Sequence, residues 1–180
     1  MQTNIYKQES FNSSPHWGKS KIWSYKDLKV HYRVTGKKSD PPIVLIHGFG
    51  ASSEHWRNNA EIFASAGFRI YGIDLMGFGQ SEQNFKGKIK NLDNQFWAHQ
   101  LASFLDEIVD IENNGKVALI GNSLGALTAI TTLYLRPELV KTIIAAPLPE
   151  PVFVTPVRLR LPNWLQKVKS LFIKLFFNFF

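Results

Sequence analysis

The sequence predicts an α/β protein in which a mostly parallel sheet with flanking helices follows an N-terminal β-hairpin. Short apolar runs alternate with helical patterns between residues 43 and 146, as in the strand–helix–strand units of parallel sheets. Two of these runs, 43–46 and 117–120, contain no polar residue, which is typical of strands covered on both faces. Upstream, residues 21–35 alternate apolar and polar around Lys26-Asp27, which indicates the hairpin.

The remaining elements follow from periodicity and from glycine, proline and asparagine punctuation. Residues 1–20 are rich in Asn, Ser, Gln and Lys, and we expect a flexible lead-in there. The other segments are, in chain order, a helix at 54–66, a strand at 68–73, a helix at 91–111, a helix at 124–135 and a strand at 140–146. Either Asn91 or Asp93 is suited to cap the second of these helices. We therefore divide the chain into the lead-in, a core at 21–149 and a tail at 150–180.

Composition narrows the class of protein. Hydrophobic residues make up 44% of the chain and charged residues 19%, as in a globular protein. The absence of cysteine excludes disulfides and thiolate metal sites and fits a cytoplasmic, reducing location. No pattern for a metal or a cofactor is present, so we expect neither. The chain also shows no secretory signal and no apolar run of the roughly 20 residues that a membrane span needs.

The net charge of +7 is concentrated at one end of the chain. Five of the 21 basic residues and none of the 14 acidic residues lie in 151–180, so the core is nearly balanced. Because no basic face with base- or backbone-reading residues is recognisable, we expect no nucleic-acid partner.

The most specific motif is GNSLG at residues 121–125. It directly follows an apolar strand and opens a helical pattern, which is the context of a G-x-S-x-G nucleophile elbow. In such a turn Gly121 and Gly125 leave room on either side of Ser123, and the helix N-terminus favours developing negative charge. Ser123 is therefore the candidate nucleophile, with Asn122 beside it.

A second motif, HGFG at residues 47–50, ends an earlier strand. Acyl transfer builds negative charge on a carbonyl oxygen, and preorganised backbone N–H groups stabilise that charge. With Gly48 and Gly50 on its flanks, the N–H of Phe49 can face inward beside the N–H of Leu124. We expect these two groups to form an oxyanion hole.

Together these stretches resemble the α/β-hydrolase fold family over residues 21–149. HGFGASSEHW, followed by DLMGFGQS at 74–81, looks most like the branch that holds haloalkane dehalogenases, epoxide hydrolases and pheophytinase-like esterases. Dehalogenases and epoxide hydrolases of that branch have an aspartate at the elbow, where this chain has Ser123. The resemblance therefore implies a serine hydrolase that acts on an apolar small-molecule ester or thioester. It also implies a structural role for His47 and a loop-anchoring role for Asp74.

The general base is the missing part of this assignment. In the resembled family the chain order is serine, acid, histidine, whereas the five histidines here all precede Ser123: His16, His31, His47, His55 and His99. Glu150 lies where some members of the branch carry the acid, although a solvated loop glutamate between two prolines is the favoured interpretation. We expect a truncated hydrolase, incomplete in its last strands and inactive alone. The alternative is a non-catalytic lipid- or partner-binding module.

The tail differs from the core in pattern. Apolar residues recur at helical spacing from Trp164 to Phe179, with Lys167, Lys169 and Lys174 between them, as in a basic amphipathic helix. Three interpretations remain open: a cap or lid helix, as the resemblance implies, a helix that lies on an anionic membrane surface through 158–180, and a partner-binding helix.

Overall fold

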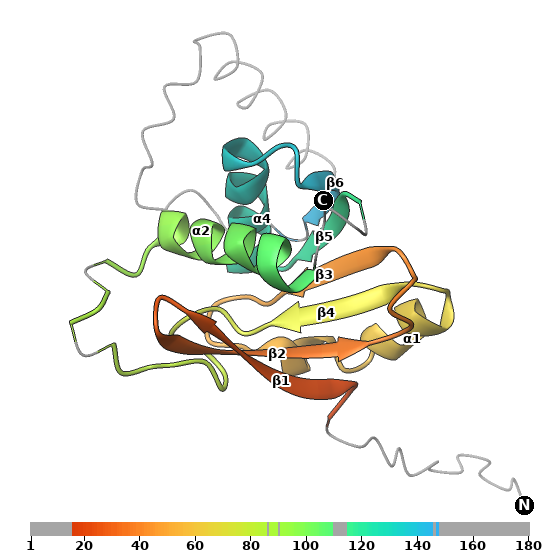
Figure 1. The fold of residues 1–180 in the computed structure, drawn as a ribbon, viewed down its shortest axis with the longest axis horizontal. Helices are drawn as coiled ribbons and strands as arrows, with labels where there is room; N and C mark the ends of the chain where they lie inside the picture. Colours follow the sequence, from red (N-terminus) through yellow and green to blue (C-terminus); the bar gives the residue numbers. More distant parts are fainter. Residues whose placement is uncertain (1–15, 86, 90, 110–114, 146, 148–180) are drawn as a thin grey trace, which may run out of the picture. The chain divides into compact units, whose positions relative to one another are not determined.

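A computed structural model describes residues 16–85, 87–89, 91–109, 115–145 and 147. The predicted fold class is confirmed, because one six-stranded sheet has the order β1-β2-β4-β3-β5-β6 with helices on both faces (Figure 1). The strands are β1 Lys19–Tyr25, β2 Leu28–Thr35, β3 Pro42–Ile46, β4 Arg69–Ile73, β5 Val117–Gly121 and β6 Val140–Ala145. Strands β4, β3, β5 and β6 run parallel, and the β1–β2 hairpin joins antiparallel at the β4 side.

The hairpin turns where the sequence predicts it. Lys26 and Asp27 both have positive φ, 53° and 56°, as in the two-residue turns whose twist matches that of the flanking strands. The pairing of Tyr25 with Leu28 then sets the register of the whole hairpin.

The predicted lead-in is shorter than expected. Strand β1 already begins at Lys19, and the side chain of Trp17 is buried. The indole lies over Gly72, where an added Cβ would be 2.6 Å from Trp17 Cζ2, and its Nε1 donates to the Ser53 carbonyl at 2.9 Å. The boundary at residue 20 is therefore too late, since one large aromatic side chain fixes the entry to β1 on the sheet.

Two hydrophobic clusters cover the two faces of the sheet. On one face α2 (Asn94–Phe104) and α4 (Leu124–Leu135) bury the larger cluster, to which Phe104, Leu101 and Ala129 belong. On the other face the 3₁₀-helix η1 (Ser53–Trp56) and α1 (Ala60–Ser65) cover a smaller cluster that includes Trp56 and Ala60. The central strands β3 and β4 are thus buried on both sides, which explains why their sequences lack alternation, whereas β6 at the end of the sheet order is largely exposed.

Two predicted helices differ from those observed. The segment 54–66 divides into η1 and α1, with a break at Arg57-Asn58-Asn59, where asparagine favours turn conformations over helix. In the segment 91–111 the helix α2 begins at Asn94. Its N-cap is Asp93 and not Asn91, because the Asp93 carboxylate accepts a hydrogen bond from the Phe96 N–H at 2.9 Å. It then widens into the π-helical turn η2 (Leu105–Val109), and residues 110–114 lie outside the described residues.

The later elements agree with the sequence. Helix α4 has the predicted bounds, and β6 follows it. In the described residues, no helix combines the length and apolar character needed to cross a membrane. Glu150 and the amphipathic segment of the tail lie outside the described residues.

Candidate active site

Ser123 occupies a strained turn between β5 and α4. Its backbone has φ 50° and ψ −112°, a region that residues other than glycine rarely adopt. In the described part of the chain, the only other non-glycine residues with positive φ are the hairpin pair Lys26 and Asp27. Strain at a single serine between a strand and a helix is typical of functional sites.

The glycines of the elbow are required by close backbone approach. A Cβ on Gly125 would overlap the Ile46 carbonyl oxygen and lie 2.6 Å from the His47 carbonyl oxygen, so helix α4 rests directly on the end of β3. A Cβ on Gly121 would lie 2.5 Å from the Ala126 nitrogen in the first turn of α4. Both glycines therefore let the helix N-terminus reach the sheet edge.

The loop after β3 passes beside the elbow. A Cβ on Gly48 would lie 2.8 Å from Asn122 Oδ1 and 3.4 Å from Ser123 Cβ. Within the described residues, neither the Phe49 N–H nor the Leu124 N–H donates a hydrogen bond. The loop therefore brings the Phe49 N–H close to the serine, where the Leu124 N–H already lies at the start of α4, and neither has an acceptor among the described residues.

His47 holds this loop in place and has no free ring nitrogen. The side chain is fully buried. Its Nδ1–H donates to the Gly48 carbonyl at 2.7 Å. Its Nε2 accepts from the Leu75 N–H at 3.0 Å. Burial lowers the pKa of His47 more than the Gly48 carbonyl raises it. The imidazole is therefore neutral and joins the loops after β3 and β4, in keeping with the structural role that the resemblance implies.

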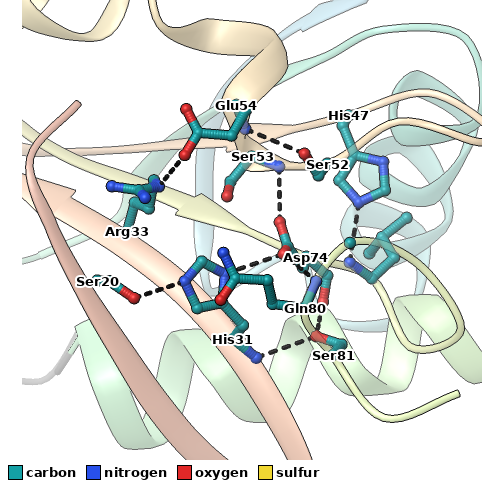
Figure 2. Close-up of polar contacts among 12 residues, drawn as sticks. Ser20, His31, Arg33, His47, Ser52, Ser53, Glu54, Asp74, Gln80 and Ser81 are labelled. Carbon is teal, nitrogen blue, oxygen red and sulfur yellow. Dashed lines mark hydrogen bonds and ion pairs between the residues drawn. The ribbon is translucent and has the colours of Figure 1, made fainter. Parts of the chain in front are cut away.

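Asp74 anchors the loop after β4. Its carboxylate accepts from the Ser53 N–H at 2.6 Å, from the Gln80 N–H at 2.9 Å and from His31 Nδ1 at 2.9 Å (Figure 2). Burial by itself would raise the pKa of Asp74, but the hydrogen bonds from His31, Gln80 and Ser53 hold it below its usual value. Asp74 is thus an ionised structural anchor, not the acid of a triad with Ser123.

The other histidines are engaged elsewhere or exposed. His16 Nδ1 lies 2.8 Å from Glu54 Oε1, and the His55 ring packs edge-on against Trp56 at 5.1 Å. His99 is exposed on α2. In the part of the chain that the structure describes, no hydrogen bond joins any of the five histidines to Ser123, and no group of acidic and histidine side chains could hold a metal ion.

The fold and this site define a class: a hydrolase-type α/β sheet with a strained serine at the carboxyl end of a central strand. The sequence profile of the alpha/beta hydrolase fold matches residues 41–179. The chain belongs to the alpha/beta hydrolase fold family.

Individual relatives agree with this family. The chain is 34% identical over 116 residues to a 2-hydroxy-6-oxononadienedioate/2-hydroxy-6-oxononatrienedioate hydrolase of Burkholderia vietnamiensis, a match that covers 62% of this chain and 37% of that protein. It is 29% identical over 138 residues to epoxide hydrolase 4 of Mus musculus, covering 77% of this chain and 36% of that protein. The chain thus spans well under half the length of these curated relatives.

Solved structures show the same fold. Cfl2 from Burkholderia cenocepacia superposes with a TM-score of 0.64 at 26% identity, over 80% of this chain and 46% of that one. Potato epoxide hydrolase I also has a TM-score of 0.64, at 25% identity, over 71% of this chain and 39% of that one.

Proposed function

We propose that this protein is a serine hydrolase of carboxylic esters or thioesters, with Ser123 as the nucleophile. The observation that carries the proposal is the strained backbone of Ser123, at φ 50° on the N-terminus of α4. Attack by Oγ on an ester carbonyl would create an oxyanion, and the N–H groups of Phe49 and Leu124 are the candidate donors to it. Losing one such donor typically costs about 3–4 kcal/mol of transition-state stabilisation.

The proposed substrate is apolar. The side chain of Phe49 is 78% exposed, and its ring packs edge-on against Phe78 at 5.3 Å. Phe78 in turn lies 5.8 Å from the ring of the buried Trp97. This row of aromatic rings begins at the residue that carries an oxyanion N–H, so it is suited to contact the acyl or alkyl chain of an ester.

Among the described residues, no histidine is hydrogen-bonded to Ser123 as a general base. We therefore expect slow turnover by the chain alone, because a positioned general base contributes about 10²–10⁴-fold. A histidine base and an acid would then come from another chain or from further sequence. Glu150 remains the proposed acid within this chain, beyond the described residues.

Imidazole rescue tests the nucleophile directly. Hydrolysis of p-nitrophenyl butyrate is measured with increasing free imidazole, for the wild-type chain and for Ser123→Ala. We expect imidazole to raise the wild-type rate roughly 10-fold above that of the variant, since a diffusing base supplies part of what a positioned base would give. The variant corrects for the reaction of imidazole with the ester in solution. Equal rates for both chains at every imidazole concentration would overturn the proposal.

Within the described residues Ser123 has no hydrogen bond to a histidine, and this favours a second candidate, a non-catalytic module that binds a lipid or a protein partner. Equal rates in the imidazole experiment would support it. A membrane version would use the basic segment 158–180, and it requires that deletion of this segment abolish flotation with anionic liposomes.

A further inference from the structure

A second serine stands in line with a histidine and an aspartate, far from Ser123. Ser20 Oγ lies 2.7 Å from His31 Nε2, and His31 Nδ1 lies 2.9 Å from Asp74 Oδ2 (Figure 2). This is the order of contacts in a Ser-His-Asp triad: serine to Nε2, and carboxylate to Nδ1. Strands β2, β4 and β3 separate β1 from β5, so the two serines are roughly 20 Å apart across the sheet.

The register of three strands places these groups on one face. His31 pairs with Ile22 across the hairpin, which makes Ser20 its diagonal neighbour on the same face. Tyr32 pairs with Ile73, and the next antiparallel pair is His31 with Asp74, whose N–H donates to the His31 carbonyl at 2.9 Å. The line of three side chains is therefore fixed by backbone pairing and does not depend on a mobile loop.

The hydrogen-bond partners define the proton positions. The Asp74 carboxylate only accepts, so His31 Nδ1 carries a proton toward it. In the neutral imidazole Nε2 is then an acceptor, and the Ser20 hydroxyl is its donor. Arg33, directly across from Ser20, is engaged by Glu54 at 2.6 Å and by the Trp17 carbonyl at 2.6 Å.

Solvent exposure increases from Asp74 and His31 to Ser20. Asp74 and His31 are each 1% exposed, whereas Ser20 is exposed at the surface. The aspartate and the histidine are thus shielded from water, whereas the serine lies at the surface. Ile22, 54% exposed on the same face, offers an apolar contact beside it.

We propose that Ser20 is a second activated serine, separate from Ser123, which reacts covalently with small activated acyl or phosphonyl donors. Oγ forms a bond to the carbonyl carbon of an activated ester while its proton passes to His31 Nε2. The ester C–O bond then breaks, and the alkoxide or phenolate leaves with that proton. Asp74 stays ionised throughout and orients the imidazole. With a fluorophosphonate the P–F bond breaks and fluoride leaves.

A fluorophosphonate probe tests this in the full chain carrying Ser123→Ala. Adducts are located by tandem mass spectrometry and their rates of formation compared at Ser20 and Ser24. Ser24 is the matched control, since it is exposed on the same face of β1 and is the other diagonal neighbour of His31. Within the described residues, it makes no hydrogen bond to the His31 ring. We expect Ser20 to be labelled at least 10-fold faster than Ser24, and this preference to disappear in denaturant.

Two variants assign the effect. Ser20→Ala should remove the fast adduct, and His31→Gln should slow it at least 10-fold while the circular dichroism spectrum is retained. Because the Ser20-to-Ser24 comparison needs no substitution in the core, it decides the question even if His31→Gln unfolds. Equal labelling of the two serines in the folded chain, or unchanged labelling of Ser20 in a folded His31→Gln variant, would overturn the proposal.

Discussion

Gly125→Ala is expected to destabilise the protein by about 3 kcal/mol or more, at the upper end of overpacking effects. An added methyl group would overlap the Ile46 carbonyl oxygen and press on that of His47. Both oxygens belong to the backbone, at the last residue of β3 and the residue after it. Because no side chain can rotate away to make room, α4 would have to move away from the sheet. Urea unfolding followed by circular dichroism measures the loss as a lower midpoint.

Gly67→Ala is the matched control for this substitution. Gly67 has φ +88°, but a Cβ there would meet no atom within 4 Å. Its cost is therefore limited to backbone strain of about 1–2 kcal/mol. A Gly125→Ala variant as stable as the wild type, or less affected than Gly67→Ala, would show that α4 does not rest on β3 as closely as described.

Local patterns carried the prediction of most elements. The hairpin turn, the bounds of α4 and the position of Ser123 between a strand and a helix all follow from short stretches of sequence, because each depends on neighbouring residues alone. The division of 54–66 into η1 and α1 does not follow from apolar periodicity, which continues across Asn58 and Asn59. The turn preference of the two asparagines is the feature of the sequence that indicates the break.

Contacts between distant strands could not be predicted in the same way. Sequence order does not reveal that β4 lies between β2 and β3, and this insertion is what brings Asp74 against His31. Once the hairpin register is known, the pairing of Ile22 with His31 places Ser20 and His31 on the same face of the sheet. The contact of Asp74 with His31 could be inferred only from the order of the strands.

Asp74→Asn is expected to cost about 3–5 kcal/mol of stability, the range for removing one partner of a buried charged network. The substitution preserves shape, but it removes the charge that accepts from His31, Ser53 and Gln80. An amide has a single acceptor oxygen, so at least one of these donors would face an NH₂ group. Asp106→Asn is the control, because Asp106 and its partner Arg136 are 42% and 39% exposed, and such surface pairs contribute about 0–1 kcal/mol.

The pH dependence of this stabilisation has a defined sign. Hydrogen bonds hold the pKa of Asp74 in the folded state below its ordinary value of 3.8, against the opposing effect of burial. The stabilisation from ionised Asp74 is therefore fully present above the unfolded-state pKa and is lost as pH falls through the folded-state pKa. The stability gap between wild type and Asp74→Asn should be constant from pH 7 to about 5 and should narrow below pH 3.8. Carboxylates common to both chains cancel in that difference, so a gap that widened on acidification would show that Asp74 is protonated in the folded protein.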